Sequence, residues 1–183
     1  MKLYNKADKF VERAFGKNGM KHFRRTVFWV KKLHPEADEA MLIAAISHDL
    51  ERAFRKDGAG NPRDSEKGFL DGEHLKIHQK EGAKIIFDFL VEEGADSALA
   101  NRVRELVEAH EVGGDKEQNI LKDADSISFF ENNAGHFIEK KARELGKEKV
   151  KEKFDWMFDR ITSKKAKEIS ERWYERAIKE LGY

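Results

Sequence analysis

The sequence of 183 residues contains no cysteine, only two prolines and no long apolar run. Without cysteine, disulfides, thiolate zinc sites, iron–sulfur clusters and a cysteine nucleophile are excluded, so any bound metal must be held by histidine, aspartate or glutamate. The longest apolar stretch, Met41 to Ile46, is far shorter than the ~20 residues that a membrane-spanning helix requires. No charged-then-apolar leader opens the chain. We therefore expect a soluble cytoplasmic protein with no membrane partner.

An excess of charge of one sign is also missing. Charged residues make up 39% of the chain, but 36 Lys+Arg against 35 Asp+Glu leave a formal net charge of only +1. This balance argues against a nucleic-acid-binding surface over the whole protein. A homodimer is the default expectation for its assembly, because dimers are the commonest oligomers.

The spacing of apolar residues predicts an all-α protein. They recur every three or four residues almost throughout, and no alternating strand pattern is present. Helices are predicted over residues 4–15, 20–33, 36–50, 73–93, 96–111 and 117–132, with two amphipathic helices after Gly135. Residues 55–72 are interrupted by glycine, proline and asparagine, which indicates a long loop. We expect a single domain over 1–183, with a core at about 20–132 and a C-terminal helical extension at about 135–183.

Six ionisable residues fall on predicted helix faces that are otherwise apolar. They are His22, His48, Asp49, His78, His110 and Asp125. One such histidine, taken alone, is best interpreted as a core residue with a hydrogen-bond partner. Six such residues together require another interpretation, because each polar group left unpaired in a core costs about 1–3 kcal/mol of stability. One or two divalent ions would satisfy all of them, so the pattern predicts a metal site in the core of a helical bundle.

The residues around four of these positions resemble the HD-domain superfamily, whose pattern is H…HD…D. The matching segments are HFRRTVFWVKKL, AAISHDLER and LKDADSISFF, which lie within about residues 20–132. The resemblance implies a helical HD-domain bundle with His22, His48, Asp49 and Asp125 as metal ligands. It selects Asp125 because the family's metal aspartate follows an alanine and precedes an apolar residue two places on, whereas Asp123 could cap or brace the site.

Two further histidines match the longer superfamily pattern H…HD…H…H…D. His78 and His110 stand where some relatives bind a second metal ion, and they could instead line a phosphate pocket beside a single ion. The chain lacks the GYP sequence of cyclic di-GMP phosphodiesterases and the HDxxED arrangement of (p)ppGpp hydrolases. It also has Arg52 where the small five-prime deoxynucleotidases have glutamate, although Asp57 matches a second acidic position of theirs. The resemblance is thus to compact, poorly characterised HD hydrolases.

The resemblance implies a metal-dependent phosphohydrolase that cleaves a phosphate ester of a nucleotide or another small phosphorylated metabolite. The cofactor would be one or two divalent ions, namely Mn²⁺, Fe²⁺, Co²⁺, Ni²⁺, Zn²⁺ or Mg²⁺. Asp49 would bind metal and accept a proton from the attacking water, while Glu51 could orient that water or act as base. The candidates for binding the substrate phosphate are Arg52, Arg55, Arg63 and Lys122, with Arg52 first.

Two other functions are compatible with the same residues. Some relatives with the six-residue pattern are dinuclear iron oxygenases. Alternatively, the metal could only brace a non-catalytic binding module. Iron content and oxygen consumption distinguish the first alternative from a hydrolase, and a site closed to water would favour the second.

Overall fold

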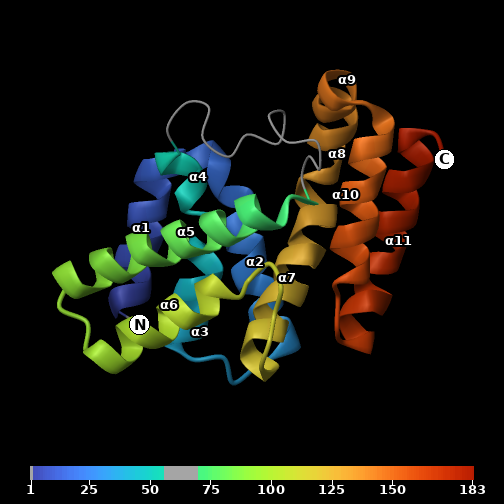
Figure 1. Ribbon diagram of the computed structural model, residues 1–183. Helices are drawn as coiled ribbons and strands as arrows, with labels where there is room; N and C mark the ends of the chain where they lie inside the picture. Colours follow the sequence, from blue (N-terminus) through green and yellow to red (C-terminus); the bar gives the residue numbers. More distant parts are fainter. Residues whose placement is uncertain (1, 56–69) are drawn as a thin grey trace.

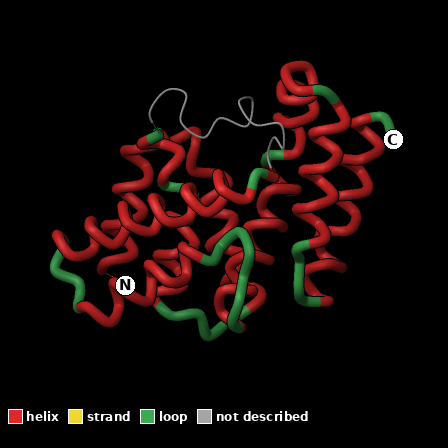
Figure 2. Tube along the Cα trace, viewed as in Figure 1, coloured by secondary structure: helices red, strands yellow, loops and turns green. Residues whose placement is uncertain are grey.

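The computed structural model describes residues 2–55 and 70–183, and within these ranges the chain is helical with no strand (Figures 1 and 2). The helices are α1 (Lys2–Phe15), α2 (Met20–Leu33), α3 (Glu39–Ser47), α4 (Glu51–Phe54), α5 (Gly72–Glu92), α6 (Ser97–Glu108), α7 (Lys116–Asn132), α8 (Ala134–His136), α9 (Ala142–Leu145), α10 (Lys147–Asp159) and α11 (Lys164–Leu181). The all-α prediction is confirmed. Most of the predicted loop at 55–72 lies outside the described residues.

Aspartate side chains set where several helices begin. Asp38 accepts a hydrogen bond from the backbone N–H of Met41, so α3 begins at Glu39 and not at residue 36 as predicted. Asp71, Asp96 and Asp115 cap α5, α6 and α7 in the same way. No described helix is both long and apolar enough to cross a membrane.

Helix α3 lies at the centre of the molecule. Every residue from 40 to 51 is buried, and α1, α2, α6 and α7 pack around this segment. A helix that is apolar on all sides must be enclosed in this way. The helix ends at Ser47, three residues earlier than predicted, because the chain then turns, with the N–H of Leu50 bonded to the carbonyl of Ser47 at 3.0 Å. This turn places His48 and Asp49 in the protein interior.

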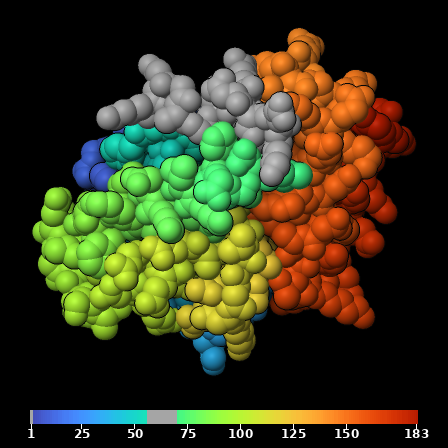
Figure 3. Space-filling model, in the orientation of Figure 1, coloured from blue at the N-terminus to red at the C-terminus, as the bar shows by residue number. Residues whose placement is uncertain are grey.

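The C-terminal helices pack against α7. Phe129 and Phe130 of α7 form an apolar cluster with Phe154 of α10 and with Ala177 and Leu181 of α11. Figure 3 shows these helices, in orange and red, directly against the rest of the protein. The two amphipathic helices predicted after Gly135 correspond to α10 and α11. The short helices α8 and α9, with a π-helical turn over Phe137–Lys141 between them, were not predicted.

Asp123 attaches the start of α11 to the bundle. Its buried carboxylate accepts hydrogen bonds from the backbone N–H groups of Thr162 and Ser163, both at 2.8 Å. The side chain of Ser163 then caps α11 through the N–H of Ala166. Asp123 therefore braces the C-terminal helices, whereas from the sequence we expected it to cap or brace the metal site.

Replacing Asp123 with alanine should lower the free energy of unfolding by about 1–3 kcal/mol, because two backbone donors lose their acceptor. Urea denaturation followed by circular dichroism measures the change. As a matched control, Asp88→Ala removes an exposed carboxylate that pairs with Lys84 on its own helix, and should change stability by no more than ~0.5 kcal/mol. An unchanged unfolding midpoint for Asp123→Ala would contradict the bracing role.

Candidate metal centre

All six ionisable residues singled out in the sequence meet in one buried region. His22 lies on α2, His78 on α5 and Asp125 on α7, while His48–Asp49 and His110 lie in the turns that follow α3 and α6. Each of the six side chains is buried. The structure thus brings together groups from five segments that are far apart in the chain.

The first group of ligating atoms is formed by His22, His48 and the two carboxylates beside them. The Nε2 atoms of His22 and His48 lie 3.2 Å apart. Asp125 Oδ1 is 3.1 Å from His22 Nε2 and 3.3 Å from His48 Nε2. Asp49 Oδ2 lies 3.8 Å from His48 Nε2. Imidazole nitrogens and carboxylate oxygens that face one point in this way could hold a divalent ion.

A second group adjoins the first and shares Asp49 with it. Asp49 Oδ1 lies 3.0 Å from His78 Nε2 and 3.8 Å from His110 Nε2, and Glu111 Oε1 lies 3.8 Å from His110 Nε2. The ligating atoms of Asp49, His78, His110 and Glu111 all lie within 4.8 Å of one another. The same limit holds for His22, His48 and Asp49. Each group could hold one ion, with the Asp49 carboxylate between them.

Hydrogen bonds at the opposite ring nitrogen orient three of the imidazoles. His48 Nδ1–H donates to the carbonyl of Ala45 at 3.0 Å, and His110 Nδ1–H donates to the carbonyl of Val107 at 2.7 Å. His22 Nδ1–H donates to Ser128 Oγ at 2.9 Å, while that hydroxyl donates to the His22 carbonyl at 2.8 Å. Because Nδ1 carries a proton in each case, Nε2 is the ring nitrogen that can bind a metal.

His110 provides the strictest test of whether a metal fits. Its Nε2 atom is fully buried and has no hydrogen-bond partner among the described residues. A buried nitrogen without a partner is costly, and a lone pair can be satisfied only by a donor or a cation. The atom faces the carboxylates of Asp49 and Glu111, which offer no donor when ionised. The residues present therefore fit a divalent cation.

Glu51 lies behind His78, on the side away from Asp49. One carboxylate oxygen accepts from His78 Nδ1 at 2.8 Å, and Arg55 donates to both oxygens at 2.8 and 2.7 Å. Burial raises the pKa of Glu51, but Arg55 and His78 outweigh it and lower the pKa to about 2. Both oxygens of the ionised Glu51 carboxylate are hydrogen-bonded, to Arg55 and to His78. This favours a role in orienting His78 over the predicted contact with the attacking water.

Sequence reasoning missed Glu111 and Arg160. Glu111 follows His110 in the turn after α6, just as Asp49 follows His48 after α3, and both histidines bond the carbonyl three residues earlier. The repeated pair of histidine and acid after a helix was the signal for Glu111.

Arg160, at the end of α10, binds carboxylate oxygens of both Glu111 and Asp125 and donates to Ser126 Oγ at 2.8 Å. No local pattern distinguishes it from other arginines.

The electrostatic environment keeps the carboxylates ionised. Burial raises the pKa of Asp49 and Asp125, but Arg52 acts on Asp49, Arg160 acts on Asp125 and His48 acts on both, so each pKa falls well below its usual range. Conversely, burial lowers the pKa of His48, but the two carboxylates raise it to about 9. The carboxylates are thus charged ligands, and the chain enters the region from the C-terminal ends of α3 and α6, which carry partial negative charge.

The predicted phosphate-binding residues have different surroundings. The two groups open onto a small pocket of about 30 Å³, and Arg52 lines it together with Lys153, which the sequence did not single out. Arg55 is bound to Glu51. Lys122 points elsewhere, donating to Asn119 at 3.1 Å and to Thr162 at 2.8 Å. Arg63 lies outside the described residues, as does Asp57.

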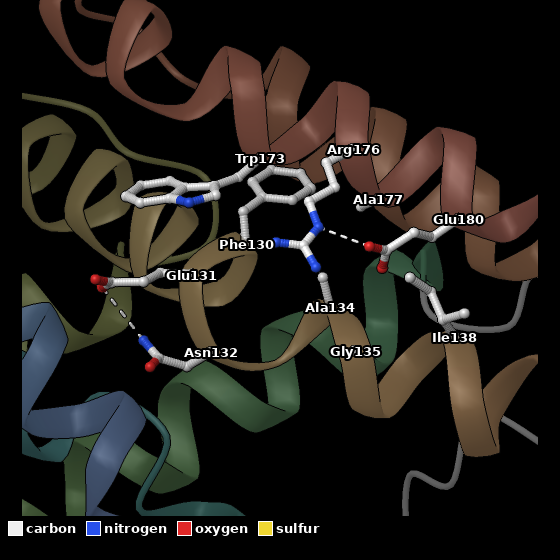
Figure 4. Close-up of a pocket in the computed structure, with 10 residues that line it drawn as sticks. All are labelled: Phe130, Glu131, Asn132, Ala134, Gly135, Ile138, Trp173, Arg176, Ala177 and Glu180. Carbon is white, nitrogen blue, oxygen red and sulfur yellow. Dashed lines mark hydrogen bonds and ion pairs between the residues drawn. The ribbon is translucent and has the colours of Figure 1, made fainter.

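A second cavity lies on another face of α7, between α7, α8 and α11 (Figure 4). It is walled by Phe130 and Trp173 and has a volume of about 260 Å³, larger than that of the pocket beside Asp49. Its charged side chains are already paired, Arg176 with Glu180 and Glu131 with Arg25. No ligating residue of either group lines it, so the pocket beside Asp49 is the candidate functional site.

Comparison with known proteins agrees with this picture. The family described as Domain of unknown function (DUF4202) matches residues 5–181, so the chain belongs to this family. The fold is similar to the crystal structure of a predicted HD superfamily hydrolase from an uncultured Thermotogales bacterium, with 17% sequence identity and a TM-score of 0.58. That match covers 96% of this chain and 87% of the other. A search of curated proteins gave no match. The predicted HD-domain fold is confirmed.

Metal analysis should distinguish the two groups. We expect two divalent ions per wild-type chain and one in Glu111→Gln, because the amide removes a charged ligand from the second group only. Elemental analysis by mass spectrometry after gel filtration counts the ions. Glu108→Gln, an exposed position on α6, is the control and should keep two. A free ion concentration of 100 times the Kd should also stabilise the wild type by about 2.7 kcal/mol. Two ions retained in Glu111→Gln would exclude this ligand assignment.

Proposed function

We propose that this member of the DUF4202 family is a metal-dependent phosphohydrolase that cleaves a phosphate ester of a nucleotide or another small phosphorylated metabolite. The observation that carries the proposal is the sharing of Asp49 between two buried groups of metal-ligating atoms beside a pocket lined by Arg52. Ligand groups alone would suit a structural metal, but an adjoining pocket with a cation suits an anionic substrate.

The ligating residues would form two sets that share Asp49. His22, His48 and Asp125 would hold one ion, His78, His110 and Glu111 a second, and Asp49 both. Divalent ions bound there would lower the pKa of a water ligand and polarise a phosphoryl oxygen. Hydrolysis forms a bond from the water oxygen to phosphorus and breaks the bond from phosphorus to the ester oxygen. A proton from the water goes to the departing ester oxygen, so an alcohol is released together with phosphate from a monoester or with a phosphate monoester from a diester.

Arg52 and Glu51 would complete the site around Asp49 and the other ligands. Arg52 Nε forms an ion pair with Asp49 Oδ1 at 3.0 Å, which leaves its terminal nitrogens available for phosphate oxygens. Asp49 would act chiefly as a ligand, because the low pKa of its carboxyl makes it a weak base. Glu51 would hold His78 in position, which is the usual arrangement of carboxylate, histidine and metal.

The direct test is a screen of phosphomonoesters and phosphodiesters with Mn²⁺, Co²⁺, Ni²⁺, Mg²⁺ or Zn²⁺ supplied. We expect phosphate release that depends on the metal. Asp49→Ala should lose both metal and activity while its far-ultraviolet circular dichroism stays near that of the wild type, because the apolar faces of the helices are unchanged. The exposed variant Asp88→Ala should keep both. Full activity in Asp49→Ala would exclude the proposal, and two irons with oxygen uptake but no phosphate release would favour the oxygenase alternative.

Glu51→Gln tests the orienting role. The variant should bind metal about 10- to 100-fold more weakly, because the partner of His78 loses its charge. Its kcat at saturating metal should remain close to the wild-type value. Metal titrations of activity measure both quantities, and the exposed variant Glu73→Gln is the control. A kcat that stays 100-fold low at saturating metal would instead make Glu51 a general base.

A further inference from the structure

Lys153 of α10 is a buried cation with no hydrogen-bond acceptor among the described residues. Only 7% of the residue is exposed, and it lines the pocket together with Asp49 and Asp125. Its Nζ lies 4.2 Å from the centre of the Trp156 ring, and no described acceptor forms a hydrogen bond or close ion pair with it. Burial lowers the pKa of Lys153 to about 8, against the attraction of Glu111. Because a buried ammonium group without a partner is costly, its placement points to a ligand.

Arg52 supplies a second cation to the same pocket from a different part of the chain. It belongs to α4, and 47% of its side chain is exposed. Its Nε lies 3.0 Å from Asp49 Oδ1, and Nη2 lies 4.0 Å from Glu111 Oε1. The guanidinium group has five N–H donors, so several remain for a ligand. The N-terminal bundle and the C-terminal helices therefore each contribute one cation to this pocket.

The remainder of the pocket is largely apolar. Phe129 of α7 and Met157 of α10 are buried beside it, and Phe137 lines it as well. Asn133 is an uncharged polar residue of the lining. An anion bound between the two cations would therefore have an apolar surface next to it, suited to an organic substituent.

The charges around the centre indicate how negative that anion is. Three carboxylates, of Asp49, Glu111 and Asp125, face three cations, of Arg52, Lys153 and Arg160. These side chains balance one another before any metal binds. Divalent ions would then leave a surplus of positive charge, which a dianion neutralises better than a monoanion does.

We infer that Lys153 and Arg52 bind the non-bridging oxygens of a dianionic phosphate monoester, whose organic group lies against Phe129, Phe137 and Met157. This inference rests on the proposed function, which leaves open whether monoesters or diesters are cleaved. It makes the C-terminal helices part of the substrate site.

The test compares Lys153→Met with Lys151→Met. Lys151 lies on the same helix but pairs with Asp155 at 2.6 Å and does not line the pocket. Isothermal titration calorimetry of the Mn²⁺-loaded proteins with inorganic phosphate gives the Kd. We expect Lys153→Met to weaken phosphate binding about 10- to 100-fold, the loss expected for one charged hydrogen bond, and Lys151→Met to stay within about twofold.

Stability separates a binding role from a structural one. Lys153→Met should melt at or above the wild-type temperature, because an apolar side chain of similar length replaces a buried charge. Unchanged phosphate binding in this variant, with or without a lower melting temperature, would overturn the inference. The wild type should also hydrolyse p-nitrophenyl phosphate with a higher kcat/KM than bis(p-nitrophenyl) phosphate, and the reverse order would overturn the monoester preference.

These readouts distinguish the inference from the proposed function. Phosphate binding that depends on Lys153, without hydrolysis of any ester, would support the anion site and contradict the phosphohydrolase. Hydrolysis with the same KM and phosphate Kd in the wild type and Lys153→Met would support the phosphohydrolase and overturn the role of Lys153.

Discussion

The structure depends on placing one carboxylate, that of Asp49, among imidazoles in the protein interior. Its Oδ1 faces His78 and His110, while its Oδ2 faces His48. A charge in this position is costly unless cations surround it. The end of α3 at Ser47 and the enclosure of α3 by four other helices both serve to bring the residue there. The same placement makes Asp49 common to both groups of ligating atoms.

The C-terminal helices complete the charge balance that the bundle begins. Arg160 binds Glu111 and Asp125, which come from different parts of the bundle, and Lys153 brings a further cation to the pocket. Asp123 binds the chain just before α11. The carboxylates of the centre and the cations of α10 are therefore parts of one electrostatic unit. The centre would carry unpaired carboxylates if these helices were removed.

Helix periodicity and local motifs were enough to predict the helical bundle and the meeting of six buried ionisable residues. They could not predict that α3 ends at Ser47, because the tight turn that follows contains no glycine or proline to mark it. Arg160 was also beyond reach, since its partners lie 35 and 49 residues away along the chain. Lys153 resembles any lysine of a charged helix until α10 is packed against α7. Glu111 could have been found, because His110–Glu111 repeats the arrangement of His48–Asp49.

The sharing of Asp49 by two metal ions is the central claim, and anomalous diffraction from crystals grown with Mn²⁺ tests it most directly. We expect two anomalous peaks, one beside His22, His48 and Asp125 and the other beside His78, His110 and Glu111, with the Asp49 carboxylate between them. A single peak, peaks elsewhere in the protein or no peak at all would contradict it.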